Sequence, residues 1–148
     1  MPATQTYTKQ VGERELEFSR IFSELGVSPT IFSVIAVGNV YHMTSELYPI
    51  SLSDYYINGN DIEIYRAKIN ALVDIIHYNG IIHGDLHLGN IVINPADNDV
   101  KIIDFGHSYY ISEIDKNTIN EVLADDVLAD ADIIREHARI HRQVCSIQ

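Results

Sequence analysis

The feature that most constrains this chain is a set of polar residues that follow short apolar runs in its middle. Residues 83–90 read His-Gly-Asp-Leu-His-Leu-Gly-Asn, which places a carboxylate five residues before an amide. Residues 104–106 read Asp-Phe-Gly and directly follow the apolar run 100–103. Short runs rich in β-branched residues and bounded by turn residues are typical of strands. We therefore expect short strands at 81–82, 91–93 and 100–103, with the polar groups of both segments at their ends.

Three of these side chains supply the groups that phosphoryl transfer requires. The reaction needs acceptor-only oxygens that hold Mg²⁺ beside the nucleotide phosphates, and a separate carboxylate beside the acceptor hydroxyl. Asp85, Asn90 and Asp104 provide such oxygens within a short stretch of sequence. The alternative is that all three are ordinary turn residues, because Asp and Asn favour loops after strands.

In order, spacing and strand context, the two segments resemble the catalytic loop and the magnesium-binding Asp-Phe-Gly of protein kinases, with Gly84 where many of them have Arg. The resemblance implies that Asp85 and Asn90 are catalytic, and that Asp85 orients or deprotonates the acceptor hydroxyl. It also implies that Asn90 and Asp104 hold Mg²⁺, and that Asp104 binds the nucleotide through this metal.

The resemblance extends upstream to the residues that would bind the nucleotide. The helix that contains Glu15 is similar to the αC region of choline kinases, so Glu15 would point toward a lysine; a solvent-exposed charge is the alternative. Lys9 precedes this helix, and is either the phosphate-pairing lysine or a surface lysine. Backbone groups around Thr44, Ser45 and Glu46 would bind adenine, although a strand of an unrelated sheet would look the same.

Two family motifs are missing from the sequence. No Gly-rich loop precedes Lys9, and no Ala-Pro-Glu follows residues 104–106. In its His-Gly-Asp form at residues 83–85 and its short tail, the chain is more similar to the small Bud32/piD261-type kinases and to the choline and aminoglycoside phosphotransferases. We therefore expect one α+β domain over residues 1–148, a reduced protein-kinase-like fold with a partial N-lobe and a trimmed C-lobe.

The hydrophobic periodicity predicts the other elements. Apolar residues at helical spacing indicate helices over 13–25, over 61–78 with Asp61 as its cap, and from 115 to about 144. Residues 30–43 indicate a hairpin around Gly38-Asn39, and a loop is expected to begin near Pro49. The acidic residues Asp125, Asp126, Asp130 and Asp132 are expected to form a solvated helix face rather than a metal site.

Histidines occur four residues apart at 83 and 87 and again at 137 and 141. The kinase resemblance already explains the first pair, in which His83 would pack together with Phe105 to fix the loop. The second pair lies on a predicted helix without the glutamate pattern of a zinc protease, so we expect no metal there.

The composition of the chain bears on its cellular location and on the classes of partner that it can bind. The net charge of −11 opposes uniform contact with nucleic-acid phosphates. The longest apolar runs are too short to span a bilayer, no export signal is recognisable, and the single cysteine allows no internal disulfide. We expect a cytoplasmic protein with no membrane or direct nucleic-acid contact.

These observations lead to two functional hypotheses. The first is an ATP- and Mg²⁺-dependent phosphotransferase that acts on a hydroxyl acceptor, either a small molecule or, as we favour, protein Ser or Thr. The second is a truncated pseudokinase or kinase mimic that regulates a partner kinase by binding. In a third possibility a partner protein completes the N-lobe, so that the chain is active only in a complex.

Overall fold

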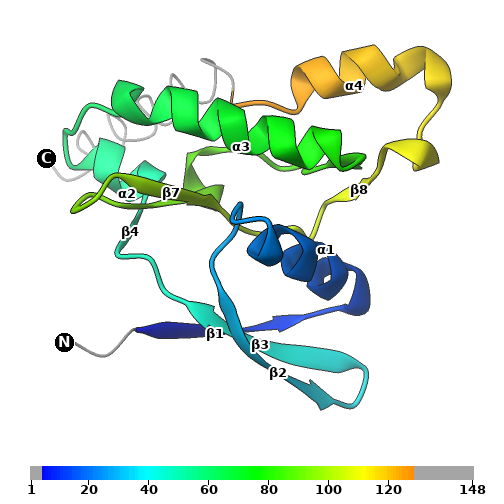
Figure 1. Cartoon of the computed structure of the whole chain (residues 1–148), viewed down its shortest axis with the longest axis horizontal. Coiled ribbons are helices and arrows are strands. Elements are labelled where there is room, and N and C mark those ends of the chain that lie inside the picture. Colours follow the sequence, from blue (N-terminus) through cyan, green and yellow to red (C-terminus); the bar gives the residue numbers. More distant parts are fainter. Residues whose placement is uncertain (1–4, 129–148) are drawn as a thin grey trace, which may run out of the picture.

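The computed structural model describes residues 5–128 and contains helices and strands in two connected parts (Figure 1). The part at the bottom of Figure 1 is a three-stranded sheet with one helix lying over it, and the part at the top carries most of the helices. The elements in chain order are β1 (Thr6–Val11), α1 (Glu13–Glu24), β2 (Ile31–Val37), β3 (Val40–Glu46), β4 (Ile50–Ser51), α2 (Leu52–Ile57), α3 (Arg66–Tyr78), β5 (Ile81–Ile82), β6 (Ile91–Asn94), β7 (Asp99–Ile102), β8 (Tyr109–Tyr110) and α4 (Ile119–Asp125).

The first sheet is antiparallel with the strand order β1-β3-β2. Its hairpin turns after Val37, as the Gly-Asn pair predicts, but β3 continues to Glu46 because it pairs with β1 along its whole length. Among the described residues β1 pairs only with β3, so its other edge is open. The polar face of α1 is exposed, whereas Leu16, Phe18 and Phe22 are buried.

The second part contains two smaller sheets. β4, β6 and β7 form one antiparallel sheet, and β5 pairs with β8. Helix α3 buries Ile69, Val73 and Ile76, which are spaced to lie on one face. This arrangement places residues 104–106, which follow β7, close to the first sheet, since Asp104 contacts Lys9 of β1.

One continuous hydrophobic core joins the two parts. Aromatic side chains of α1 contribute to it together with apolar side chains of α3, β6 and β7. Backbone contacts strengthen the junction, because the Ile102 N–H donates to the Val27 carbonyl at 2.8 Å and Lys101 Nζ donates to the Gly26 carbonyl at 2.7 Å. The turn after α1 is therefore attached to β7.

The structure corrects three of the predicted elements. The Asp61 carboxylate accepts a hydrogen bond from the Glu63 N–H, but the chain then forms a 3₁₀ turn (Glu63–Tyr65) and the α-helix begins only at Arg66. The buried Tyr65 ring, whose hydroxyl donates to Asn98, occupies the predicted first turn of that helix. The segment after Pro49 is not simply a loop, since it contains β4 and α2.

The C-terminal helix is the third correction. A 3₁₀ turn (Lys116–Thr118) precedes α4, and α4 ends at Asp125 instead of continuing through Val127. The remainder of the predicted helix, with Asp130, Asp132, His137 and His141, lies outside the described residues. The assignment of a single domain over residues 1–148 therefore stays a prediction. No helix within residues 5–128 has the length and apolar character needed to cross a bilayer.

The core predicts unequal costs for two phenylalanine truncations. Phe22 is fully buried and stacks on Phe105 with ring centroids 5.0 Å apart, whereas Phe32 is 50% exposed on β2. Phe22→Ala should lower the free energy of unfolding by about 3–5 kcal/mol, because it removes buried area and leaves a cavity. Phe32→Ala should cost less than about 1 kcal/mol. Urea denaturation of both variants measures the difference, and equal costs would contradict this description of the core.

Candidate active site

The loop after β5 is built around the buried imidazole of His83. Its Nε2 lies 2.9 Å from the Ile103 carbonyl oxygen, and its Nδ1 accepts a hydrogen bond from the Asp85 N–H at 3.2 Å. Burial lowers the pKa of His83, so the ring is neutral and Nε2 carries the proton. The ring also packs edge-on against Phe105 at 5.1 Å, which connects this loop to the Asp-Phe-Gly segment.

The structure brings together Asp85 and Asn90, the two residues expected to be catalytic. Asn90 is buried, and its Nδ2 donates to the Asp85 carbonyl at 2.9 Å and to the Asp85 carboxylate at 3.2 Å. The Asp85 side chain remains 40% exposed, so its carboxylate is accessible. Because the amide nitrogen of Asn90 faces Asp85, the amide oxygen is directed elsewhere. The Ile103 N–H donates to the Asn90 backbone carbonyl at 2.9 Å, which places Asn90 next to the start of the Asp-Phe-Gly segment.

Asp104 meets two residues from the N-terminal part of the chain. Lys9 Nζ, on β1, lies 2.6 Å from Glu15 Oε2 of α1 and 3.3 Å from Asp104 Oδ1. Burial alone would lower the pKa of Lys9, but the carboxylates of Glu15 and Asp104 raise it. Burial alone would raise the pKa of Asp104, yet the Lys9 charge lowers it. Lys9 and Asp104 are therefore both ionised at neutral pH.

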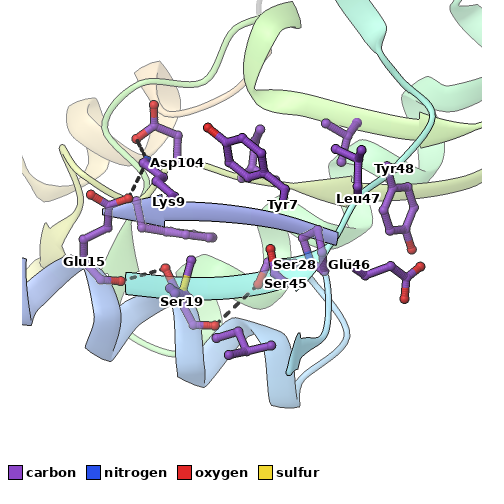
Figure 2. A pocket seen from close by; sticks show the side chains of 16 residues that line it. Tyr7, Lys9, Glu15, Ser19, Ser28, Ser45, Glu46, Leu47, Tyr48 and Asp104 are labelled. Carbon is purple, nitrogen blue, oxygen red and sulfur yellow. Dashed lines mark hydrogen bonds and ion pairs between the residues drawn. The ribbon is translucent and has the colours of Figure 1, made fainter. Parts of the chain in front are cut away.

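The backbone of Asp104 is in the left-handed region, with φ of 65°. This conformation is uncommon outside glycine and costs of the order of 1 kcal/mol. Hydrogen bonds compensate locally, because the Gly106 N–H donates to Asp104 Oδ1 at 3.3 Å. The turn directs the carboxylate toward Lys9 (Figure 2).

A cavity of about 260 Å³ lies beside this ion-pair cluster, between the first sheet and the second (Figure 2). Its lining begins at the charged groups and continues along apolar and hydroxyl side chains toward the end of β3. The residues that line it are Tyr7, Lys9, Glu15, Ser19, Ser28, Pro29, Ile31, Met43, Ser45, Glu46, Leu47, Tyr48, Val92, Ile103, Asp104 and Phe105.

The structure modifies the expectation for the adenine-binding segment. Ser45 and Glu46 line the cavity, but Thr44 does not, because its hydroxyl lies on the other face of the sheet, 2.8 Å from the Thr8 hydroxyl. β3 is the central strand, and the Glu46 and Leu47 N–H groups already donate to the chain's own carbonyls. Ser45 and Glu46 therefore lie at the cavity and the Thr44 side chain does not, and adenine binding by this segment stays a prediction.

Asp126 is a site residue that the sequence did not reveal. It is only 6% exposed, and its carboxylate accepts from the His83 N–H at 2.8 Å and the Gly84 N–H at 3.0 Å. His77 Nε2 of α3 lies 2.8 Å from the same carboxylate. The expected solvated acidic face is therefore wrong at Asp126, which leaves the helix after Asp125 to fix the loop backbone. Spacing alone gave no signal, since the three partners lie more than 40 residues upstream.

The family profile described as "Protein kinase domain" matches residues 21–136, which is more than half of the chain. This chain belongs to the protein kinase family. The matched region contains Asp85, Asn90 and Asp104, whereas Lys9 and Glu15 precede it. The positions of Lys9 and Glu15 beside Asp104 therefore come from the structure alone.

The chain is similar to several curated kinases over part of their length. It is 38% identical over 65 residues to a "Probable serine/threonine-protein kinase KIN1 homolog" of Enterocytozoon bieneusi, covering 44% of this chain and 11% of that protein. A protein of the same description from Encephalitozoon cuniculi is 35% identical over 83 residues, covering 56% and 14%. The "EKC/KEOPS complex subunit bud32" of Dictyostelium discoideum is 31% identical over 61 residues, covering 41% and 24%.

A solved structure confirms the fold class. The structure described as the Cydia pomonella Granulovirus kinase, PK-1, superposes with a TM-score of 0.61 at 16% identity, over 74% of this chain and 45% of that one. At this identity the likeness concerns the fold alone. The expected α+β, reduced protein-kinase-like fold is confirmed.

Gly84, where many protein kinases have Arg, occupies a position with no room for a side chain. Its φ is 89°, and a Cβ atom would lie 2.3 Å from the His107 carbonyl oxygen. Ser108, next to His107, donates from Oγ to the His83 carbonyl at 2.7 Å, which holds the two segments together. Glycine is therefore required at this position, because any larger residue would clash with the backbone of His107.

A second set of contacts, separate from the cavity, holds α1 in place. The Tyr110 hydroxyl donates to Glu17 at 2.6 Å, and the Tyr110 ring packs edge-on against Phe18 at 5.1 Å. The Arg14 guanidinium lies over both rings and forms an ion pair with Glu113. These contacts join α1 to the segment after the Asp-Phe-Gly and so support the position of Glu15.

The donor set of this site fits magnesium better than a transition metal. Within residues 5–128 no three His, Cys, Asp or Glu side chains converge as ligands. An Asp carboxylate and an Asn amide oxygen that leave other positions to water and phosphate are typical of Mg²⁺. His87 belongs to the loop structure, since its Nδ1 accepts from the Gly89 N–H at 3.0 Å.

Asp126 predicts a pH-dependent contribution to stability. Burial alone would raise the pKa of Asp126, but hydrogen bonds from His77 and from the Gly84 and His83 N–H groups lower it below the ordinary value. A carboxyl group whose pKa is lower in the folded state stabilises the protein above its unfolded pKa, and this contribution is lost as the pH falls through the folded pKa.

Asp126→Asn should therefore cost about 3 kcal/mol at pH 7, because the loop N–H groups lose an ionised acceptor. The cost should shrink when the pH is lowered from about 5 to about 2. Denaturant unfolding at several pH values measures both effects. Asp125→Asn, at the exposed neighbouring position, is the control, and an equal loss in both variants would refute the role of Asp126.

Gly84 and Gly59 form a matched pair for testing the steric contact. Their φ angles are 89° and 90°, but nothing lies within 4 Å of a Cβ built at Gly59. Gly59→Ala should cost about 1–2 kcal/mol, the strain of a left-handed alanine. Gly84→Ala should cost at least about 2 kcal/mol more, since the backbone of His107 must move. Similar unfolding free energies for the two variants would contradict the predicted contact.

Proposed function

We propose that this chain is an ATP- and Mg²⁺-dependent phosphotransferase that transfers the γ-phosphoryl group to an alcohol, with protein Ser or Thr as the acceptor class we favour. The observation that carries the proposal is the convergence of Lys9, Glu15 and Asp104 at one end of a cavity. Asp85 and Asn90 are in contact with each other on the adjoining loop. Charged groups that converge at a cavity are typical of functional sites, and a lysine beside an Asp carboxylate supplies the cation and the metal ligand that nucleotide phosphates need.

Each charged group has a separate part in this proposal. Lys9, held by Glu15, would pair with phosphate oxygens of the nucleotide, and its raised pKa keeps it cationic. Asp104 and the amide oxygen of Asn90 would hold Mg²⁺, which neutralises charge on the transferred phosphoryl group. The cavity segment from Ser45 to Tyr48 would receive the base.

Asp85 would act on the acceptor. Its accessible carboxylate would accept the hydroxyl proton while the acceptor oxygen bonds to the γ-phosphorus and the bond to the β,γ-bridging oxygen breaks. The Asn90 amide, which donates to this carboxylate, would keep it oriented for that contact. The neutral His83 ring fixes the backbone that carries Asp85.

The acceptor class is inferred from the relatives. Two of them are described as probable serine/threonine-protein kinases. The present chain spans only about a tenth to a quarter of the length of the curated relatives described above, so substrate choice is part of the proposal. The open edge of β1 supports a partner protein that completes the first sheet, and the bud32 relative is described as a complex subunit.

The test is transfer of labelled γ-phosphate from ATP, with and without Mg²⁺, to the protein itself and to generic protein and small-molecule acceptors. Asp85→Asn should lower transfer at least about 100-fold, because the group that receives the hydroxyl proton is lost. It should leave thermal stabilisation by Mg²⁺-ATP intact, since Asp85 is not assigned to nucleotide or metal.

Asp104→Asn should instead abolish both transfer and Mg²⁺-dependent stabilisation. Asp125→Asn is the matched carboxylate control, because Asp125 is exposed and outside the site. Stabilisation by Mg²⁺-ATP without any transfer would favour the pseudokinase alternative. If the chain shows no phosphate transfer and no stabilisation by Mg²⁺-ATP, the proposal of a nucleotide site in this chain is contradicted.

A further inference from the structure

His87, two residues after Asp85, has one ring nitrogen that the loop uses and one that it does not. Its Nδ1 accepts a hydrogen bond from the Gly89 N–H at 3.0 Å and so caps a 3₁₀ turn (Leu88–Asn90). A neutral imidazole has one acceptor nitrogen and one N–H group, so Nε2 carries the proton. The structure gives this N–H no hydrogen bond within residues 5–128. The cap therefore accounts for only half of the polar ring.

The unused nitrogen of His87 lies beside the Asp85 carboxylate. His87 Nε2 is 3.7 Å from Asp85 Oδ2, and Asn90 Nδ2 donates to the same oxygen at 3.2 Å. Asp85 Oδ1 has no hydrogen bond in the described part of the chain, and the Asp85 side chain is 40% exposed. The two oxygens of this carboxylate are therefore unequal. The loop brings two N–H groups to Oδ2 and leaves Oδ1 open.

The position of the His87 ring is fixed by Gly89. A Cβ atom at Gly89 would lie 2.8 Å from His87 Cε1 and 3.1 Å from Nδ1, so the ring packs where a side chain would otherwise be. A cap alone does not need an imidazole, because the shorter side chains of Ser, Asp and Asn accept from the same kind of N–H. The reach of the ring to Asp85 is the part that capping does not explain.

We propose that His87 is a positioning residue for Asp85. Its Nε2–H and the Asn90 amide together hold Oδ2, so that Oδ1 is the oxygen that faces the acceptor hydroxyl. The hydroxyl proton moves to Oδ1 while the acceptor oxygen bonds to the γ-phosphorus and the bond to the β,γ-bridging oxygen breaks, releasing ADP. His87 neither gains nor loses a proton in this step. The inference rests on the proposed function for the reaction itself.

The separation of 3.7 Å is longer than a hydrogen bond between these atoms. Hydrogen bonds among catalytic groups are often long without substrate and shorten in the complex with it. The contact between His87 Nε2 and Asp85 Oδ2 therefore closes when acceptor and nucleotide occupy the site. A donor that tightens at that moment contributes to the rate of transfer rather than to substrate binding.

Two substitutions separate the capping nitrogen from the positioning nitrogen. His87→Asn keeps an acceptor for the Gly89 N–H but is too short to reach Asp85. His87→Gln carries an N–H donor at about the reach of Nε2. His87→Asn should lower kcat roughly tenfold to a hundredfold, the effect of losing a hydrogen bond to a charged group, and leave the KM for ATP within about threefold. His87→Gln should recover most of the lost kcat.

The measurement is transfer of labelled γ-phosphate from Mg²⁺-ATP to the generic acceptor that the native chain labels best. Thermal unfolding of each variant establishes that the fold and the cap are retained. His42→Asn is the matched control and should transfer at the native rate, since His42 lies on β3 and does not line the cavity.

A double-mutant cycle tests whether His87 acts through Asp85. In the Asp85→Asn background, His87→Asn should cause no further loss of the residual transfer, because the carboxylate that His87 positions is already gone. A direct contact of His87 with the phosphoryl group would instead lower the residual rate by the same factor as in the native background.

Three results would overturn the inference and leave the proposed function standing. Native kcat in His87→Asn would show that the ring only caps the turn. Equal losses in the native and Asp85→Asn backgrounds would show that His87 does not act through Asp85. A kcat of His87→Gln no higher than that of His87→Asn would show that a donor at this place does not help Asp85. If the native chain transfers no phosphate to any acceptor, the proposed function fails and the inference fails with it.

Discussion

The ring of Phe105 lies between Phe22 of α1 and the imidazole of His83, with centroids 5.0 Å and 5.1 Å away. Through this buried stack, α1 contacts two loops of the second part. Because the interior is close-packed, Phe105 cannot shift without moving both neighbours. Asp104, directly before it, is consequently held where Lys9 can reach its carboxylate. The ionic contact at the cavity therefore depends on an apolar one.

Hydrogen bonds, together with the aromatic stack, hold the loop that carries His83 and Asp85 in place. The Asp126 carboxylate holds the backbone of His83 and Gly84 by accepting their N–H hydrogen bonds, and the Ile103 carbonyl holds the His83 ring. The neutral ring in turn accepts from the Asp85 N–H. The Asp126 and His83 side chains are buried with their hydrogen bonds made, and no buried side-chain nitrogen or oxygen among residues 5–128 lacks a partner. Such satisfied networks rigidify a site, because every partner lost would leave an unsatisfied polar group.

Charge is distributed unevenly between the functional groups. The Lys9 ammonium forms ion pairs with two carboxylates, those of Glu15 and Asp104. An incoming triphosphate would therefore find this cation already oriented, but would share it with the two carboxylates. The Asp85 carboxylate, by contrast, is accessible and faces an amide. In the proposed function, this difference separates the groups that would hold phosphate and metal from the carboxylate that would meet the acceptor.

Much of this protein could be predicted from residues that are near each other in sequence. The strands at 81–82, 91–93 and 100–103, the hairpin at Gly38-Asn39 and the helix at 13–25 follow from local periodicity and turn chemistry, and so do the positions of residues 83–90 and 104–106 at strand ends. The pairing of Lys9 with Asp104 and the burial of Asp126 could not be derived in this way. Each joins groups more than 40 residues apart, and the free energy of such a contact depends on burial that only the packed structure creates. Periodicity predicted an exposed acidic helix at Asp126. In the structure, this carboxylate instead turns toward the loop, because the His83 and Gly84 N–H groups need an acceptor.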